Sequence, residues 1–318
     1  MNIFLNGALL IIGFITLWLS SEKAIVFCSR AAALFGLSEL FIGFIVIAIS
    51  SGLPELLVAI QSVNAHATEL SIGNIIGSNL VNLSMALGIA VVFVGPIVIV
   101  RKDYIEQLVI FIASFLPMLF IFINGQVTRT MGIVLLITYL IGIVWLWYTT
   151  ENEIYKYRMG NNPTPKHTSS ILAHLIMYLF LVVASSKICL DNALILASYI
   201  HIPLAIVGVI IFGIGTALPE IAINIQAVRK KNYSLALSNS LGSVFSQGAL
   251  IPGFLAVISP TSLSIEHLYA IIPFLIIAYS IVGYHLIFIK KIEKISGLLL
   301  IGSYLAFVYY EFLIVIKK

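Results

Sequence analysis

The chain has 318 residues, of which 61% are hydrophobic and only 9% are charged, and its formal net charge is +4. Soluble domains carry about 25% charged residues, so this composition excludes a soluble globular protein and indicates an integral membrane protein. The basic residues report orientation in the bilayer, and we expect lipid rather than nucleic acid as the partner.

Ten apolar segments are long enough to cross a bilayer, which takes about 20 residues. In chain order they cover residues 3–19, 36–63, 70–95, 102–123, 129–149, 170–190, 202–228, 234–258, 266–289 and 294–315. Outside them only 150–169 is both long and polar, and we interpret it as a linker between two halves, 1–149 and 170–318. The sequence therefore predicts an all-α integral membrane protein with ten transmembrane helices.

Loop charges predict the orientation of these helices, because basic residues in short loops favour the cytoplasmic side. With the N-terminus outside, thirteen of the 17 Lys and Arg residues fall in loops on the inner side and four on the outer side. We therefore expect both termini outside, the 150–169 linker in the cytoplasm, and a location in the plasma membrane.

The two halves are related by an internal repeat. Sliding the sequence by 165 residues places segment 43–88 on segment 208–253 without a gap. The matching residues are not limited to the common apolar types but include Gly, Pro, Glu, Gln, Asn and Ser. Each half carries five spans, an odd number, so the second copy enters the membrane from the opposite side. This inverted repeat is typical of secondary transporters, whose substrate site lies at the bilayer midplane between the copies.

A proline followed by a glutamate occurs in both copies, at Pro54-Glu55 and Pro219-Glu220. Proline frees the backbone carbonyl four residues before it, so we expect two broken helices. Free carbonyls at membrane depth are tolerated only inside protein or beside a wet cavity. The freed carbonyls belong to Ser50 and Gly215.

Hydroxyl and amide side chains accompany each glutamate. Side chains four residues apart lie on one helical face, as in the pairs Ser51/Glu55, Thr216/Glu220, Ser78/Asn82 and Ser243/Gln247. Together they offer many oxygen atoms, and calcium takes about six to eight oxygen ligands. We therefore predict a cation site formed by oxygen-bearing side chains, with the backbone oxygens of Ser50 and Gly215. The side chains are those of Glu55, Glu220, Ser51, Thr216, Ser78, Ser243, Asn82 and Gln247. Asn74 and Asn239 we expect to form hydrogen bonds between helices.

Electrostatics indicates what such a site does. A carboxylate in a low-dielectric interior costs several kcal/mol, and two facing carboxylates cost more. A divalent cation, several monovalent cations or protons must neutralise them, which is the basis of an antiport mechanism. A cation channel is the alternative, although channels usually build filters from rings around a pore. We do not expect an enzyme, because the two acids are symmetric copies and no HExxH motif is present.

The repeated segments resemble the two α-repeats of the sodium/calcium exchanger family, within the calcium/cation antiporter superfamily. "SSGLPELLVAI" and "GTALPEIAINI" are similar to that family's G-T-S-x-P-E motif, and "GNIIGSNLVN" and "SNSLGSVFSQ" to its G-N-x-x-G-S-N motif. The resemblance implies that Glu55 and Glu220 are the central Ca²⁺ ligands in a protein that exchanges Ca²⁺ for another cation.

The chain departs from the family pattern at three positions. Gly52 and Ala217 stand where the family usually has serine, and Gln247 stands where many sodium-coupled members have an acid. The resemblance therefore leaves both H⁺ and Na⁺ open as the counter-ion, and Mg²⁺ or Mn²⁺ open as alternative cargo. We expect a functional monomer without a cofactor, and we expect Cys28 and Cys189 to be inert.

Overall fold

The structure is a computed structural model that describes residues 3–34, 53–99, 104–157, 165–200, 203–258, 263–264 and 266–316. It is an all-helical membrane protein with two repeats. Within these ranges eight helical stretches are long and apolar enough to span a membrane, namely Ile3–Ala24, Glu69–Phe93, Tyr104–Asn124, Ser169–Tyr199, Val207–Arg229, Tyr233–Ile258, Tyr269–Ile289 and Lys294–Leu313.

The two remaining expected spans have different outcomes. The apolar part of the 129–149 segment, Arg129–Trp145, is shorter than these eight but lies in a longer helix, α8 (Arg129–Tyr157). Of the 36–63 segment only its last part, α4 (Leu53–Asn64), falls within the described residues. The 150–169 segment is helical at both ends, because α8 continues to Tyr157 and α9 begins at Pro165.

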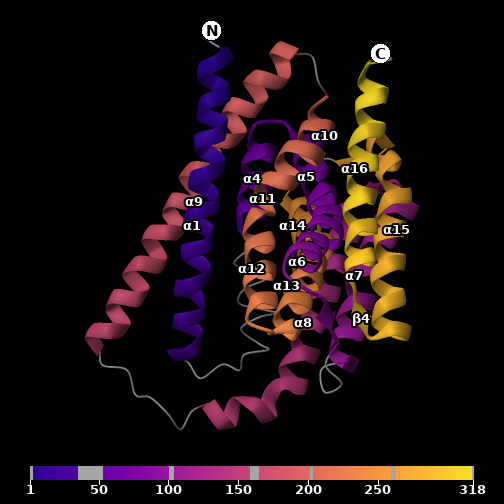
Figure 1. The fold of residues 1–318 in the computed structure, drawn as a ribbon. Coiled ribbons are helices and arrows are strands. Elements are labelled where there is room, and N and C mark those ends of the chain that lie inside the picture. Colours follow the sequence, from indigo (N-terminus) through magenta and orange to yellow (C-terminus); the bar gives the residue numbers. More distant parts are fainter. Residues whose placement is uncertain are drawn as a thin grey trace.

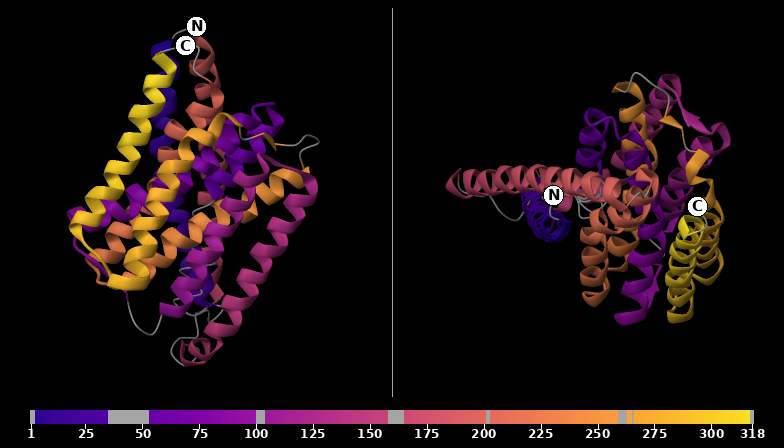
Figure 2. Two further views of the ribbon diagram at one scale, coloured as in Figure 1. Left: turned by 90° about the vertical axis from the view of Figure 1, so that its right-hand side faces the viewer. Right: turned by 90° about the horizontal axis from the view of Figure 1, so that it is seen from above.

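Two long helices form a peripheral pair. α1 (Ile3–Leu34) and α9 (Pro165–Ile200) pack against each other and lie at one side of the remaining bundle (Figure 1). Seen from above, α9 extends well beyond the other helices (Figure 2). The large hydrophobic side chains that these helices leave exposed, such as Ile176 and Phe180, suit a lipid environment.

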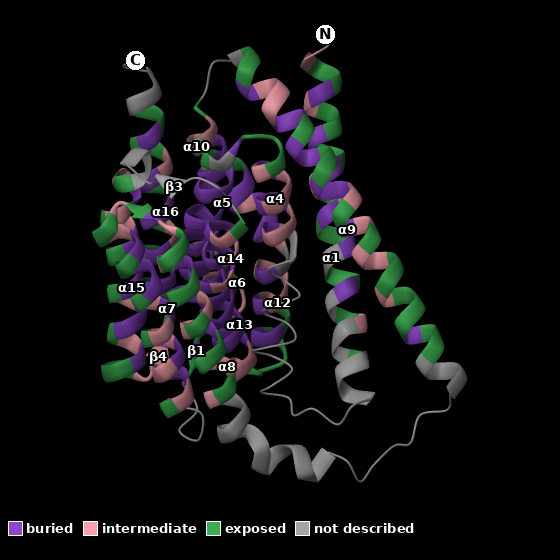
Figure 3. Ribbon diagram, turned by 180° about the vertical axis from the view of Figure 1, so that it is seen from behind, coloured by how far each residue is buried: buried purple, intermediate pink, exposed green. Residues whose placement is uncertain are grey.

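The centre of the bundle consists of the segments that carry the repeated motifs. In the first half these are α4, α5 (Thr68–Val81), the π-helical turn η2 (Asn82–Ala86) and α6 (Leu87–Phe93). In the second half they are α10 (Leu204–Ile206), η4 (Val207–Phe212), α11 (Gly213–Thr216), α12 (Leu218–Arg229), α13 (Tyr233–Phe245), η5 (Ser246–Leu250) and α14 (Ile251–Ile258). Figure 3 shows that buried residues concentrate in these segments.

The outer part of each half repeats as well. α7 (Tyr104–Asn124) and α8 in the first half correspond to η6 (Glu266–Ile271), α15 (Ile272–Tyr284), η7 (His285–Ile289) and α16 (Lys294–Ile316) in the second. α4 and α12 have the same length and begin 165 residues apart, as do the starts of α8 and α16. The repeat that the sequence predicts is thus present in the helix boundaries.

Two short antiparallel ladders join the halves at opposite ends of the molecule (Figure 3). β1 (Ile97–Val98) pairs with β4 (Lys291–Ile292), and β2 (Gln126–Val127) pairs with β3 (Leu263–Ser264). Each ladder takes one strand from each half. This arrangement, with equivalent strands at opposite ends, is what an inverted repeat produces.

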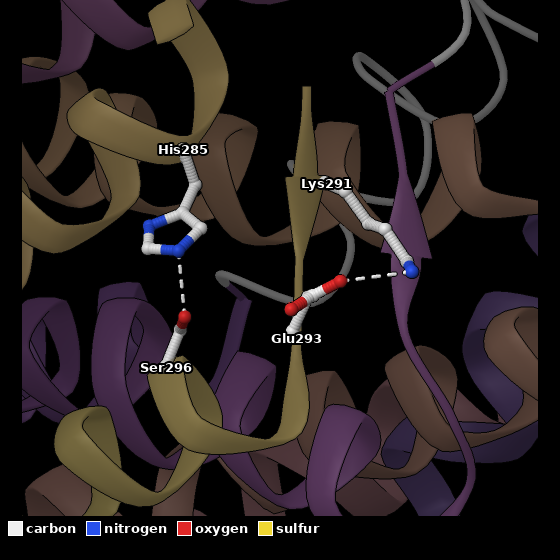
Figure 4. A network of polar contacts seen from close by, with 4 residues as sticks. All are labelled: His285, Lys291, Glu293 and Ser296. Carbon is white, nitrogen blue, oxygen red and sulfur yellow. Dashed lines mark hydrogen bonds and ion pairs between the residues drawn. The ribbon is translucent and has the colours of Figure 1, made fainter. Parts of the chain in front are cut away.

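A polar network fixes the turn between α15 and α16 (Figure 4). His285 Nε2 lies 2.6 Å from Ser296 Oγ, and its Nδ1 lies 2.8 Å from the Ile281 carbonyl. Lys291 Nζ lies 2.9 Å from Glu293 Oε1. The Lys291 ammonium lowers the pKa of the exposed Glu293 carboxyl by hydrogen bonding and by its charge. His285 thus ties the turn together.

Candidate ion-binding site

The second repeat contains the expected broken helix. α11 ends at Thr216, and Ala217 adopts φ −84° and ψ 1°, outside helical values. α12 then begins with Pro219 in its first turn, where a missing backbone N–H is tolerated. Glu220 follows in the same turn, so the break places a carboxylate at the start of a helix inside the protein.

The break expected in the first repeat would fall on residues 50–52, which lie outside the described residues. The predicted ligands Ser50 and Ser51, and the departure at Gly52, therefore have no structural outcome. α4 begins at Leu53, and Glu55 lies in its first turn, at the position that matches Glu220 in α12.

The two glutamates are fully buried, with no exposed surface on either side chain. Their carboxylates lie close enough to repel each other electrostatically. Both lie in the first turn of a helix, at matching positions of the two halves. Two negative charges placed together in a low-dielectric interior are costly unless a positive charge joins them.

A chain of two amides, one from each half, leads to Glu55. Gln247, in η5, donates a hydrogen bond from Nε2 to Glu55 Oε1 at 3.2 Å. Asn82, in η2, donates from Nδ2 to Gln247 Oε1, also at 3.2 Å. Both amides are fully buried, and Asn82 Oδ1 has no hydrogen-bond partner within the part of the chain that the structure describes. Three of the predicted site residues are therefore joined directly.

Hydroxyl groups form a second cluster one helical turn away. Ser78 on α5 and Thr216 on α11 lie with their hydroxyl oxygens 3.2 Å apart. The side-chain oxygen of Asn74, Oδ1, accepts from both hydroxyls, at 3.2 Å from Ser78 and 3.1 Å from Thr216. Ser78 and Asn82 belong to neighbouring turns of one helix, so the hydroxyl cluster and the amide chain lie next to each other on the same helical face. Asn74 makes the expected contact between helices, and it does so within the site.

The matching asparagine of the second half has a different environment. Asn239 Nδ2 lies 2.9 Å from Asn224 Oδ1 and 3.4 Å from the backbone oxygen of Glu220. Asn224 in turn donates to Ser240 Oγ at 2.6 Å. This cluster joins α12 to α13 and contacts Glu220 through its backbone oxygen. Asn224 has an alanine, Ala59, at the equivalent position of the first repeat. A comparison of the two repeats therefore could not identify Asn224 as part of this cluster.

Glycines bring the backbones of the two halves together beside the hydroxyl cluster. A Cβ atom on Gly77 would lie 2.3 Å from the Val209 carbonyl oxygen, and one on Gly208 would lie 2.2 Å from the Leu70 carbonyl oxygen. No side chain fits at either position. α5 and η4 therefore touch through their backbones and close the site on that side.

Two further predicted residues, Gly215 and Ser243, are also buried. Gly215 lies in α11 under the ring of Phe14 from α1, which a Cβ atom would meet at 2.1 Å. Ser243 is fully buried on α13, one turn before Gln247. No group of three or more His, Cys, Asp or Glu residues gathers anywhere among the described residues. The candidate site brings together two carboxylates and neutral oxygens.

The family of the chain follows from its match to known proteins. The profile of the family described as "Sodium/calcium exchanger protein" matches residues 5–148 and 170–313, two segments displaced by 165 residues. The chain belongs to the sodium/calcium exchanger family, and it is a cation antiporter of that family rather than an enzyme.

Curated relatives extend over most of the chain. "Inner membrane protein YrbG" of Escherichia coli is 28% identical over 269 residues, which cover 80% of this chain and 81% of YrbG. "Sodium/calcium exchanger MaX1" of Methanosarcina acetivorans is 24% identical over 350 residues, which cover 96% of this chain and 98% of MaX1.

The fold also matches solved structures. The sodium-calcium exchanger NCX_Mj, soaked with 2.5 mM Na⁺ and 0.1 mM Ca²⁺, gives a TM-score of 0.69 at 25% identity, covering 95% of this chain and 97% of NCX_Mj. The same exchanger soaked with 2.5 mM Na⁺ and 10 mM Sr²⁺ gives a TM-score of 0.70 at 25% identity. The ten-helix, two-repeat fold predicted from the sequence is confirmed by these likenesses.

Proposed function

We propose that this antiporter exchanges Ca²⁺ for H⁺ or Na⁺ by alternating access, with Glu55 and Glu220 as the carboxylates that the ions share. One observation carries the proposal: both glutamates are fully buried and close enough to repel each other, at matching positions of two inverted halves. Intramembrane carboxylates generally serve ion pathways, because an unpaired charge there is expensive.

Oxygen atoms around this pair supply the rest of a calcium shell. Asn82 Oδ1 faces no other hydrogen-bond partner in the described part of the chain, and the hydroxyls of Ser78 and Thr216 lie one turn away. Hard cations such as Ca²⁺ bind carboxylate, amide and hydroxyl oxygens of this kind. The repeat assigns further oxygens on the same grounds: Ser243, Ser51, and the backbone oxygens of Gly215 and Ser50.

Charge explains why the transport is an exchange. Two ionised carboxylates in the occluded interior cost several kcal/mol, so the empty carrier crosses slowly. A Ca²⁺ ion cancels both charges, and so do two protons or sodium ions. The two halves rearrange only when the charge of the carboxylates is cancelled. After Ca²⁺ is released on one side of the membrane, the carrier therefore returns only with the counter-ion bound.

The choice of counter-ion depends on three positions of the site that carry no charge in this chain. Ala217, Gly52 and Gln247 offer no hydroxyl or carboxylate where many sodium-coupled members have one, and Gln247 presents its N–H to Glu55 in this structure. The carboxylate pair itself suits either H⁺ or Na⁺. Mg²⁺ and Mn²⁺ are alternative divalent cargo, although Mg²⁺ usually keeps part of its water shell.

We propose a plasma-membrane location, with both termini outside, the 150–169 linker in the cytoplasm and a monomer as the functional unit. The start of α1 and the end of α16 lie at the same end of the molecule, which supports an even number of spans (Figure 1). The relative from Escherichia coli carries the name of an inner membrane protein. The half boundaries at 149 and 170 agree with the gap between the two matched segments.

Transport into proteoliposomes tests this function. We expect ⁴⁵Ca²⁺ uptake under an outward H⁺ or Na⁺ gradient, with the potential clamped by an ionophore, and none without a counter-ion. A 3 Na⁺ to 1 Ca²⁺ cycle moves one net charge and responds by about 2.3 kcal/mol per 100 mV, whereas a cycle of two monovalent ions per Ca²⁺ does not. Calcium flux that needs no counter-ion would instead show a channel.

A further inference from the structure

Two hydrogen bonds in this structure join residues that are equivalent to each other in the repeat. Asn82 and Gln247 are separated by 165 residues, and so are Ser114 and Tyr279, whose hydroxyl donates to the Ser114 carbonyl at 3.0 Å. Equivalent residues of an inverted repeat meet only near the pseudo-twofold axis that relates the halves. The amide pair therefore lies near that axis, which also relates the two carboxylates.

The amide pair is nevertheless directional. Asn82 donates to Gln247 and Gln247 donates to Glu55, so the chain of hydrogen bonds runs toward one carboxylate only. Asn82 Oδ1 is left without an acceptor role among the described residues. Applying the axis to this pattern gives the mirror arrangement, in which Gln247 donates to Asn82 Oδ1 and Asn82 donates to Glu220.

In transporters with inverted repeats, the two halves move against each other around a fixed site to face alternate sides. Because the halves are equivalent, the two facing states are related by exchanging the conformations of the halves. We propose that the Asn82–Gln247 pair is a reversible amide relay, directed at Glu55 in one facing state and at Glu220 in the other. This inference rests on the proposed exchange of cations at the two glutamates.

The relay gives each amide two alternating roles. In the state described here, the Gln247 N–H competes with the cation for Glu55, while the free Asn82 oxygen is available as a ligand. In the opposite state the Asn82 N–H competes for Glu220, and the Gln247 oxygen becomes the free ligand. Asn82 and Gln247 are thus positioning residues that tune ion affinity separately on the two sides of the membrane.

Calcium affinity measured from each side tests the relay. Right-side-out and inverted membrane vesicles are prepared from cells that produce the wild type, Asn82→Leu or Gln247→Leu. Initial rates of ⁴⁵Ca²⁺ uptake against a fixed counter-ion gradient then give the KM at each face. The matched control is Asn79→Leu, because Asn79 lies on the helix that leads into Asn82 but donates to Met118 Sδ on α7, at 3.4 Å.

We expect a crossed pattern. Gln247→Leu lowers the KM about tenfold at one face and raises it at the other, and Asn82→Leu does the reverse, since a hydrogen bond to a charged group accounts for at least such a factor. The ratio of the two KM values stays at the wild-type value in Asn79→Leu. A merely structural role would change both faces alike.

Three results would overturn the relay. Both variants changing the same face in the same direction would exclude it, and so would KM values that stay unchanged at both faces. A wild type that shows no counter-ion-dependent uptake would remove the proposed function, and the relay with it. If the leucine variants do not insert into the membrane, Asn82→Ala and Gln247→Ala carry the same comparison.

Discussion

Gly208→Ala should force apart the two helical segments that close the site. The added Cβ would lie 2.2 Å from the Leu70 carbonyl oxygen and 2.8 Å from the Asn74 amide nitrogen, whereas ordinary contacts begin at 3.4 Å. Both neighbours are backbone atoms, so η4 must move away from α5 by about 1 Å. Overpacking of this kind costs about 1–3 kcal/mol. The displaced wall carries Asn74 and Ser78, so exchange should slow as well.

Thermal unfolding of the purified protein in detergent measures the stability loss, and ⁴⁵Ca²⁺ uptake measures the loss of exchange. The matched control is Gly302→Ala on α16, because nothing among the described residues lies within 4 Å of a Cβ added there. That variant should be as stable as the wild type or more so by up to about 1 kcal/mol, since alanine favours helices. Equal melting temperatures for the two variants would refute the reasoning.

Three further predictions concern single contacts. Thr216→Val keeps the shape but removes a buried hydroxyl with three hydrogen-bond contacts, so we expect a stability loss of about 1–3 kcal/mol and weaker Ca²⁺ binding by calorimetry. Ser296→Ala removes the partner of His285 Nε2 and should cost about 1 kcal/mol in a melting experiment, with transport unchanged; lost transport would show a role beyond the turn. Lys291→Met should raise the pKa of Glu293 toward its ordinary value in an NMR titration. Because the lowered pKa contributes stability that is lost as the pH falls through it, this variant should lose that part of the acid sensitivity.

The sequence pointed to the candidate site most sharply where the repeat doubled the signal. Glu55 and Glu220 were found because a proline and an acid recur at the same spacing in both halves, a pattern that lipid-facing positions do not tolerate. The i,i+4 spacing also predicted that Ser78 and Asn82 share one helical face, and in the structure both are fully buried on neighbouring turns. It did not show that Asn82 would contact Gln247, because helical periodicity gives the face of a residue but not its partner on another helix.

Contacts that differ between the halves lay beyond prediction. Asn74 and Asn239 are equivalent in the repeat, but the first lies among the site hydroxyls and the second joins Asn224 behind Glu220. Phe14 covers Gly215 from a helix about 200 residues earlier in the chain, and no local pattern marks that contact. These asymmetries arise from packing between distant segments, which the repeat alone does not determine.

The polar segment 150–169 shows a different limit. Its composition indicated a linker, but α8 extends to Tyr157 and α9 begins at Pro165. Proline is well placed in the first turn of a helix, where its missing N–H has no partner in any case. A polar sequence excludes a buried span but not a helix that continues out of the membrane.

The proposed exchange requires two buried carboxylates to share one divalent ion, and equilibrium Ca²⁺ binding to the purified protein tests this requirement directly. We expect one Ca²⁺ per chain in the wild type. Glu55→Gln and Glu220→Gln should each weaken binding by a similar factor, about 150-fold to 5,000-fold, since breaking a buried charged pair costs about 3–5 kcal/mol. Unchanged Ca²⁺ affinity in either variant, with the fold intact, would contradict the shared site.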